Sequence, residues 1–144
     1  MNTILDAYAV IAALAGEPAA SEVEAELRKG DTGLTAVNLA EVIDQLVRPA
    51  RRSRQDVEAS LASLTAGGMR VVPVDQSIGN LAGEIRAGHY QRRTAAISLA
   101  DCIALAASSV LGAGLATADP ALAGVARRLG VKVLALPDSG GKRP

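Results

Sequence analysis

The chain has 144 residues, 49% of them hydrophobic, which is enough for one folded domain with a substantial core. Tyr8 and Tyr90 are its only aromatic residues, which argues against a base-stacking surface of the kind found in RRM and OB domains. The 15 basic and 15 acidic residues cancel, which argues against a protein that binds nucleic acid through overall positive charge.

The first half of the chain alternates between short apolar runs and helical patterns. Residues 2–5 predict a strand, and residues 7–15 predict a helix. Pro18 fits the first turn of a second helix, which Gly30 ends. The pattern then predicts a strand over residues 33–37, a helix over residues 38–47 and a helix over residues 53–65 that Ser53 caps.

The second half continues the alternation. Its predicted elements are a strand over residues 69–74, helices over 76–87 and 99–111, a strand over 115–117, a helix over 120–129 and a strand over 131–136. Strands that alternate with helices in this way predict an α/β fold with a parallel sheet covered on both faces. We expect one domain over residues 1–136 and a flexible C-terminal tail over residues 137–144.

Four acidic residues stand where an apolar run passes into the next element, namely Asp6, Glu41, Asp101 and Asp119. Two of them follow predicted strands, and Glu41 and Asp101 fall in the first turns of predicted helices. Ligands of an open parallel sheet bind outside the carboxyl ends of its strands, and all four acids can reach that edge. Carboxylates in apolar surroundings need a proton, a cation or hydrogen-bond donors. If the four converge, they form a site for a divalent metal ion.

Helix capping is an alternative role for three of these acids. Two of the spacings fit a capping box and the third fits an N-cap followed by proline; the segments are Asn38-x-x-Glu41, Ser98-x-x-Asp101 and Asp119-Pro120. Asp6 has no such explanation, because it interrupts an otherwise apolar run from Ile4 to Ala15. Capping and metal binding are compatible, since both place a carboxylate at a helix N-terminus.

The ordered set of these segments resembles the PIN-domain ribonucleases, and in particular the VapC toxins of toxin–antitoxin pairs. The matching segments span nearly the whole chain in the order of that family, and they are Ile4-Leu5-Asp6-Ala7-Tyr8-Ala9-Val10-Ile11, Asn38-Leu39-Ala40-Glu41-Val42, Ser98-Leu99-Ala100-Asp101-Cys102-Ile103-Ala104-Leu105-Ala106 and Leu115-Ala116-Thr117-Ala118-Asp119-Pro120. Tyr8 departs from the family, which often has Ser or Thr at that position.

The resemblance implies a metal-dependent endoribonuclease in which Asp6, Glu41, Asp101 and Asp119 hold one or two Mg²⁺ or Mn²⁺ ions. It also implies a three-layer PIN-like fold, with a central parallel sheet of about five strands in the order 3-2-1-4-5 flanked by helices. A homodimer and an antitoxin partner, whose C-terminal segment blocks the site, are further implications of the family. RNA would be the substrate.

The chemistry of the side chains agrees with such a site. Oxygen ligands suit Mg²⁺ or Mn²⁺, and the chain has no cluster of His and Cys for zinc. We assign Asp6 and Asp101 as direct ligands, with Glu41 and Asp119 completing the coordination or orienting water. The polar groups that could support these carboxylates, besides capping helices, are those of Asn38, Ser98 and Thr117.

Local groups of arginine could contact RNA phosphates even though the net charge is zero. The candidates are Arg48, Arg51, Arg52, Arg54, Arg92 and Arg93. The alternative interpretation of such runs is a solvated helix end.

Two other classes of function remain open. An aspartyl-phosphate enzyme could use Asp6 as its nucleophile, although such enzymes usually need a second Asp where this chain has Tyr8. A catalytically inactive PIN-like interaction module, whose acids only cap helices, is the non-enzymatic alternative. The single histidine, His89, has no supporting motif for a catalytic relay and is predicted in a surface loop.

Composition also bears on location. The lone Cys102 cannot form an intramolecular disulfide and fits a small buried position, which suits a reducing cytoplasm. No Lys or Arg precedes the apolar run that begins at Tyr8, which argues against a signal peptide. The longest weakly polar stretch, residues 102–118, is shorter than the ~20 residues of a spanning helix, so no membrane segment is predicted.

Overall fold

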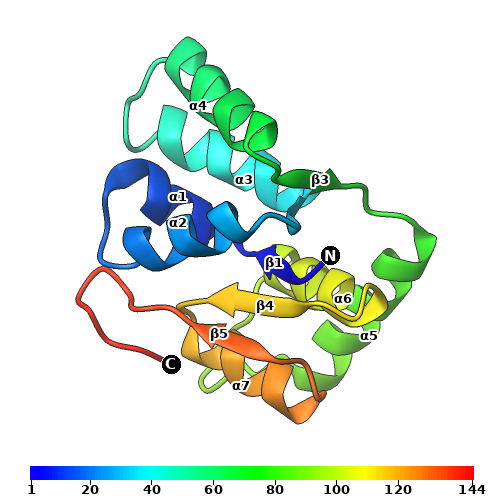
Figure 1. The fold of residues 1–144 in the computed structure, drawn as a ribbon. Helices are drawn as coiled ribbons and strands as arrows, with labels where there is room; N and C mark the ends of the chain where they lie inside the picture. Colours follow the sequence, from blue (N-terminus) through cyan, green and yellow to red (C-terminus); the bar gives the residue numbers. More distant parts are fainter.

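A computed structural model describes residues 1–144 and has a five-stranded parallel sheet at its centre (Figure 1). The strand order is β3-β2-β1-β4-β5, and every neighbouring pair is parallel. This confirms the predicted α/β class and the strand order. The strands are β1 (Thr3–Leu5), β2 (Thr32–Thr35), β3 (Arg70–Val72), β4 (Gly114–Thr117) and β5 (Val133–Ala135).

Seven helices connect and cover the strands. They are α1 (Ala7–Ala15), α2 (Ala20–Lys29), α3 (Ala36–Val47), α4 (Arg54–Ala66), α5 (Gln76–His89), α6 (Leu99–Val110) and α7 (Pro120–Arg128). None of them combines the length and the apolar character needed to cross a membrane.

Alternating side chains of the strands explain the three layers. Ile4 and Leu115 belong to a core cluster with residues of α5, α6 and α7, whereas Leu5 and Ala116 belong to a second cluster with α1, α2, α3 and α4. Successive residues of a strand point to opposite faces of the sheet, so β1, β4 and β5 each contribute to both clusters. The helices therefore lie in two layers, one on each face of the sheet.

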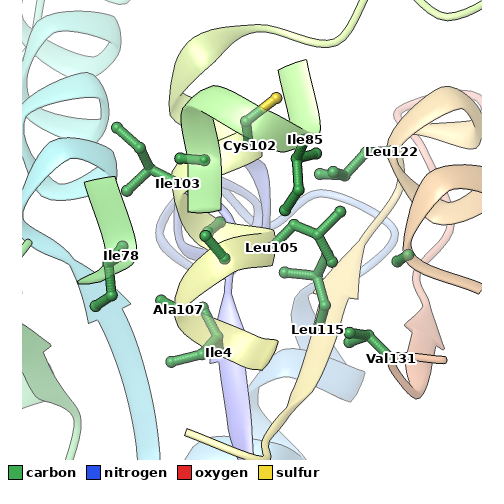
Figure 2. Packing of buried hydrophobic residues seen from close by; sticks show 14 of the residues in the cluster. Ile4, Ile78, Ile85, Cys102, Ile103, Leu105, Ala107, Leu115, Leu122 and Val131 are labelled. Atoms are coloured by element: carbon green, nitrogen blue, oxygen red, sulfur yellow. The ribbon is translucent and has the colours of Figure 1, made fainter. Parts of the chain in front are cut away.

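Helix α6 is the most deeply buried helix of the first cluster. In Figure 2 its side chains Cys102, Leu105 and Ala107 lie between strand residues such as Ile4 and neighbouring helices. Seven consecutive residues from Cys102 to Ser108 are buried, which places the middle of α6 firmly in the core. Cys102 is a small buried hydrophobe, as predicted, and burial raises the pKa of its thiol to about 11.

Several predicted boundaries were wrong by a few residues. Helix α3 begins at Ala36 and not at Asn38, because the Thr35 side chain caps it, so the predicted strand over residues 33–37 ends early. Helix α2 begins at Ala20, beyond Pro18. His89 is the last residue of α5 and is half-buried, so its prediction as a surface-loop residue was also wrong.

The packing of α6 leads us to one prediction about stability. Leu105 is fully buried, and replacing it with Ala should lower the free energy of unfolding by about 2–5 kcal/mol, because the change removes packed atoms and leaves a cavity. Leu111 at the end of the same helix is 42% exposed, and the matched Leu111→Ala change should cost less than about 0.5 kcal/mol. Urea unfolding followed by circular dichroism measures both; equal losses would contradict this packing.

Candidate functional site

All four predicted acids line one cavity of about 380 Å³ at the carboxyl edge of the sheet. They come from four different parts of the chain: Asp6 follows β1, Glu41 lies on α3, Asp101 lies on α6 and Asp119 follows β4. The parallel sheet brings them together, because the ends of its strands meet at one edge. The predicted convergence in space is therefore present, while the roles of the residues stay predictions.

Asp6 joins β1 to α1 and is 4% exposed. Its backbone N–H donates to the carbonyl oxygen of Ala116 in β4 at 3.1 Å. Its side chain is the N-cap of α1, with Oδ1 accepting from the Ala9 N–H at 2.7 Å. The expectation that Asp6 has no capping role was therefore wrong: the apolar run around it hides a helix start.

Glu41 approaches the cavity from the second turn of α3. The expected first-turn position and the capping box with Asn38 were both wrong, because the helix starts two residues earlier. Asn38 is fully buried, and its side-chain oxygen accepts from the Thr35 hydroxyl at 2.5 Å. Glu41 Oε2 is buried without a hydrogen-bond partner, and so is Asn38 Nδ2. Glu41 thus brings an unsatisfied acceptor to the site.

Asp101 and Asp119 hold the starts of α6 and α7. Ser98 and Asp101 form the predicted capping box: the Ser98 Oγ accepts from the Asp101 N–H at 3.0 Å, and Asp101 Oδ2 accepts from the Ser98 N–H at 2.8 Å. Asp119 is the predicted N-cap, with Oδ1 accepting from the Leu122 N–H at 2.8 Å and Pro120 in the first turn. In each of the two aspartates the other carboxylate oxygen accepts no hydrogen bond from the protein.

The electrostatics of the cavity are strongly unfavourable for negative charge. The pKa of Asp6 is raised to about 7, mainly by burial and to a smaller extent by the nearby Asp101 and Asp119, against the lowering effect of the Thr117 hydroxyl and the Ala9 N–H. Burial, followed by Asp101, also raises the pKa of Glu41, while the Asn38 amide lowers it. No Lys, Arg or His lines the cavity. The carboxylates therefore lack a counter-ion from the protein.

Two further residues of the cavity wall were missed in the sequence. Asp138 and Ser139 line the cavity beside Tyr8, three to four residues after β5 ends at Ala135. The rule that located Asp6 and Asp119, an acid just beyond a strand, would have found Asp138 as well. The glycine-rich composition of residues 137–144 concealed this signal, and their predicted flexibility stays a prediction.

The side chains as they stand are not arranged around an ion. No three His, Cys, Asp or Glu side chains lie close enough together to hold one metal ion. The capping bonds of Asp6, Asp101 and Asp119 explain the spread, since each fixes one carboxylate oxygen toward its own helix. The donor set nevertheless consists only of oxygens, as Mg²⁺ and Mn²⁺ require.

The candidate RNA-binding arginines lie outside this cavity. Arg48 pairs with Asp44 and Arg54 pairs with Glu58 on their own helices, and Arg52 donates to the Leu14 carbonyl oxygen at 2.9 Å. The remaining three are exposed and make no ion pair or side-chain hydrogen bond within the chain, and they are Arg51, Arg92 and Arg93.

The buried charge of Asp6 predicts a pH dependence of stability in EDTA. Because the folded pKa of about 7 lies above the ordinary 3.8, the folded chain binds more protons than the unfolded chain between these values. The free energy of unfolding should therefore fall as pH rises from about 4 to about 7, by about 1.36 kcal/mol for each pH unit, and level off above. Urea unfolding at several pH values measures it.

Asp6→Asn is the matched variant for this measurement. Asn keeps the oxygen that caps α1 but carries no charge, so its unfolding free energy should vary less over the same pH range. Identical slopes for the two proteins would show that Asp6 is not the titrating group.

Comparison with known proteins agrees with the geometry. The PIN domain family model matches residues 3–128. Comparison with the curated protein sequences finds no match. Several solved structures are similar in fold at low sequence identity. FitAcB from Neisseria gonorrhoeae is 24% identical, with a TM-score of 0.66, over 91% of this chain and 95% of that chain.

Two others are toxins or their complexes. VapBC2 from Rickettsia felis, bound to a DNA fragment from its promoter, is 12% identical with a TM-score of 0.69, over 92% of this chain and 97% of that chain. VapC20 from Mycobacterium tuberculosis, a toxin that cleaves the sarcin–ricin loop, is 16% identical with a TM-score of 0.67, over 85% and 94%. With a family match over most of its length and the sheet order found above, this chain belongs to the PIN domain family.

Proposed function

We propose that this protein is an endoribonuclease that depends on Mg²⁺ or Mn²⁺ and acts as the toxin of a toxin–antitoxin pair. The observation that carries the proposal is the single cavity in which carboxylates from four elements meet without a basic side chain. Membership of the PIN domain family supports a nuclease, and the similar toxin structures support the biological role.

Three features of the site fit a divalent cation. Asp6 is buried, and its neutral form is favoured by burial and by two neighbouring carboxylates. Glu41 Oε2 is a buried acceptor with no donor. Asp101 and Asp119 each keep one carboxylate oxygen outside their capping bonds. A bound dication would reverse the electrostatic penalty for all of these groups.

We assign the binding of the cation to Asp6 and Asp101, with Glu41 and Asp119 completing its coordination or orienting water. The capping bonds occupy only one oxygen of each aspartate, so the other oxygen of each is available to a cation. The ion, when bound, would lower the pKa of water to supply the nucleophile and stabilise charge on the phosphoryl oxygens. Thr117 and Asn38 lower the pKa values of Asp6 and Glu41, and we assign to these two polar residues the support of the carboxylates.

The helices contribute to binding of the scissile phosphate. The N-termini of α1, α6 and α7 begin at the cavity, where Asp6, Ser98 and Asp119 are their N-cap residues. Each N-terminus carries a partial positive charge. In a cavity that has no Lys or Arg, these three helix ends are the protein's own source of positive potential for a phosphodiester.

The biological assignments rest on the similar structures. VapC20 cleaves the sarcin–ricin loop, and VapBC2 was solved on a DNA fragment from its promoter. By analogy we assign to this chain an RNA substrate and an antitoxin protein as partner; the homodimeric state is carried over from the family resemblance, and the lone Cys102 suits a cytoplasmic location. Because the overall charge is neutral, we assign the binding of RNA phosphates to local basic residues. The exposed Arg51, Arg92 and Arg93 are free to make such contacts.

Cleavage assays test the nuclease directly. The antitoxin-free chain should cut structured or single-stranded RNA in Mg²⁺ or Mn²⁺ and not in EDTA, and Asp6→Asn should lower the rate by more than ~100-fold, because changing even the groups behind metal ligands costs about 10- to 100-fold. Circular dichroism checks that the variant is folded, and calorimetry compares its metal binding with that of the wild type. Equal cutting by both proteins would indicate a contaminating nuclease and contradict the proposal.

The arginine assignment predicts a change in salt dependence. Replacing Arg51, Arg92 or Arg93 with Ala should weaken RNA binding and reduce the slope of log affinity against log salt by about 1 for each phosphate that is no longer neutralised. Arg48→Ala is the matched control, because Arg48 already pairs with Asp44 on an exposed helix face. Binding to an Asp6→Asn background in Mg²⁺ is measured by fluorescence anisotropy. Unchanged slopes would remove these arginines from the interface.

A catalytically inactive interaction module is the alternative function. Its supporting observation is that Asp6, Asp101 and Asp119 all cap helices and that no three acids are arranged around an ion. This alternative predicts no binding of Mg²⁺ or Mn²⁺ in calorimetry and no RNA cleavage by the wild type. Either metal-dependent cleavage that Asp6→Asn abolishes or metal binding by the wild type would exclude it.

A further inference from the structure

The C-terminal segment, residues 137–144, is a wall of the acidic cavity. Figure 1 shows it leaving β5 and turning back past the side of the molecule that carries α2. Two of its residues, Asp138 and Ser139, line the cavity together with the four acids of the sheet edge. Residues distant in the sequence therefore complete the site.

Two contacts attach this segment to the first two helices. At its start, the Tyr8 hydroxyl on α1 donates to the carbonyl oxygen of Pro137 at 3.0 Å. Near its end, the Arg143 guanidinium donates to both carboxylate oxygens of Glu22 on α2, at 3.0 and 2.6 Å, and to the Ala135 carbonyl oxygen at 2.6 Å. A bidentate pair of this kind fixes orientation as well as distance.

Between these contacts the segment folds on itself. Asp138 Oδ1 accepts from the backbone N–H groups of Gly140 and Lys142, at 2.9 and 2.8 Å. The Asp138 N–H donates to the Lys142 carbonyl oxygen at 2.8 Å. The turn is thereby closed, and Ser139 lies at its exposed tip.

Tyr8 and Ser139 also mark the boundary between two cavities. Both residues, together with Glu41, line the acidic cavity and a neighbouring one of about 780 Å³ that extends between α1 and α3 as far as Arg52. If the scissile phosphate of an RNA strand lies at the acids, the adjacent nucleotide would lie at this boundary. No Lys or Arg stands at the boundary itself, which favours a hydroxyl contact to a base or ribose there over a charged contact to a phosphate.

We propose that the C-terminal segment, held by Tyr8 and Arg143, determines substrate specificity by positioning Ser139 against the nucleotide next to the scissile phosphate. The inference rests on the proposed ribonuclease function and adds to it the residues that recognise the flanking nucleotide. Tyr8 and Arg143 act as positioning residues, and Ser139 supplies the hydroxyl that contacts base or ribose. Tyr8 takes this role at the position where the resembling family often has a small hydroxyl residue.

Kinetics and cleavage-site mapping on an RNA with randomised sequence test the proposal. Tyr8→Phe and Arg143→Ala should each raise KM about two- to tenfold, as expected when a positioning hydrogen bond is removed, and should add cleavage sites with altered flanking nucleotides. The kcat should change much less than KM, because the carboxylates are not altered. The double variant Glu22→Arg with Arg143→Glu restores a pair of opposite charges and should recover the wild-type cleavage pattern.

Arg28→Ala is the matched control, since Arg28 lies on α2 and pairs with Glu24 at 3.6 Å without touching the C-terminal segment. It should leave KM and the cleavage pattern unchanged. Thermal unfolding checks that every variant is folded. An unchanged KM and pattern in Tyr8→Phe and Arg143→Ala, or a fall in kcat alone, would overturn the inference while leaving the ribonuclease intact.

If the proposed ribonuclease function is wrong, the wild type does not cut RNA. Equilibrium binding of the same RNA to the wild type and the two variants in Mg²⁺ then measures the contribution of the C-terminal segment to RNA affinity. Weaker binding by the variants supports the inference, and equal binding overturns it.

Discussion

The constraint on which the site depends is the burial of the Asp6 carboxylate between β1 and α1. Its backbone bonds to β4, its side chain caps α1, and it is almost inaccessible to solvent. A carboxylate in this position carries a desolvation cost that only a proton, donors or a cation can offset. One residue thus fixes the junction of two strands and a helix and also sets the need for positive charge in the cavity.

Each aspartate of the site uses one carboxylate oxygen in a capping bond and leaves the other oxygen for the cavity. One oxygen of Asp6, Asp101 or Asp119 accepts a backbone N–H at a helix start, so the carboxylate keeps a definite position even without an ion. This division also explains why the acids line one cavity without being arranged around a metal. Under the proposed function, cation binding would reorient carboxylates that the fold has already positioned.

The sequence predicted those parts of the site that depend on local spacing. The Ser98–Asp101 capping box and the Asp119 N-cap are encoded within four residues, and both were found. Glu41 was misplaced along its helix because the apolar Ala36 and Val37, which follow the Thr35 cap, were assigned to the preceding strand. Asp138 also follows a strand, but it was missed because the glycine-rich composition of residues 137–144 indicated a flexible tail. The sheet order came from family resemblance, since spacing does not determine which strands pair.

Positive charge is distributed in a way that suits a site of this kind. Several arginines are engaged in ion pairs on helix surfaces, for example Arg48 with Asp44 and Arg143 with Glu22, and none enters the acidic cavity. An arginine there would neutralise the carboxylates and compete with a cation for them. The fold instead directs three helix N-termini at the cavity, and at each of them one carboxylate oxygen of Asp6, Asp101 or Asp119 accepts a backbone N–H while the other oxygen stays outside that bond. Under the proposed function, the same absence of basic residues that makes the acids unfavourable on their own leaves them available for a divalent ion.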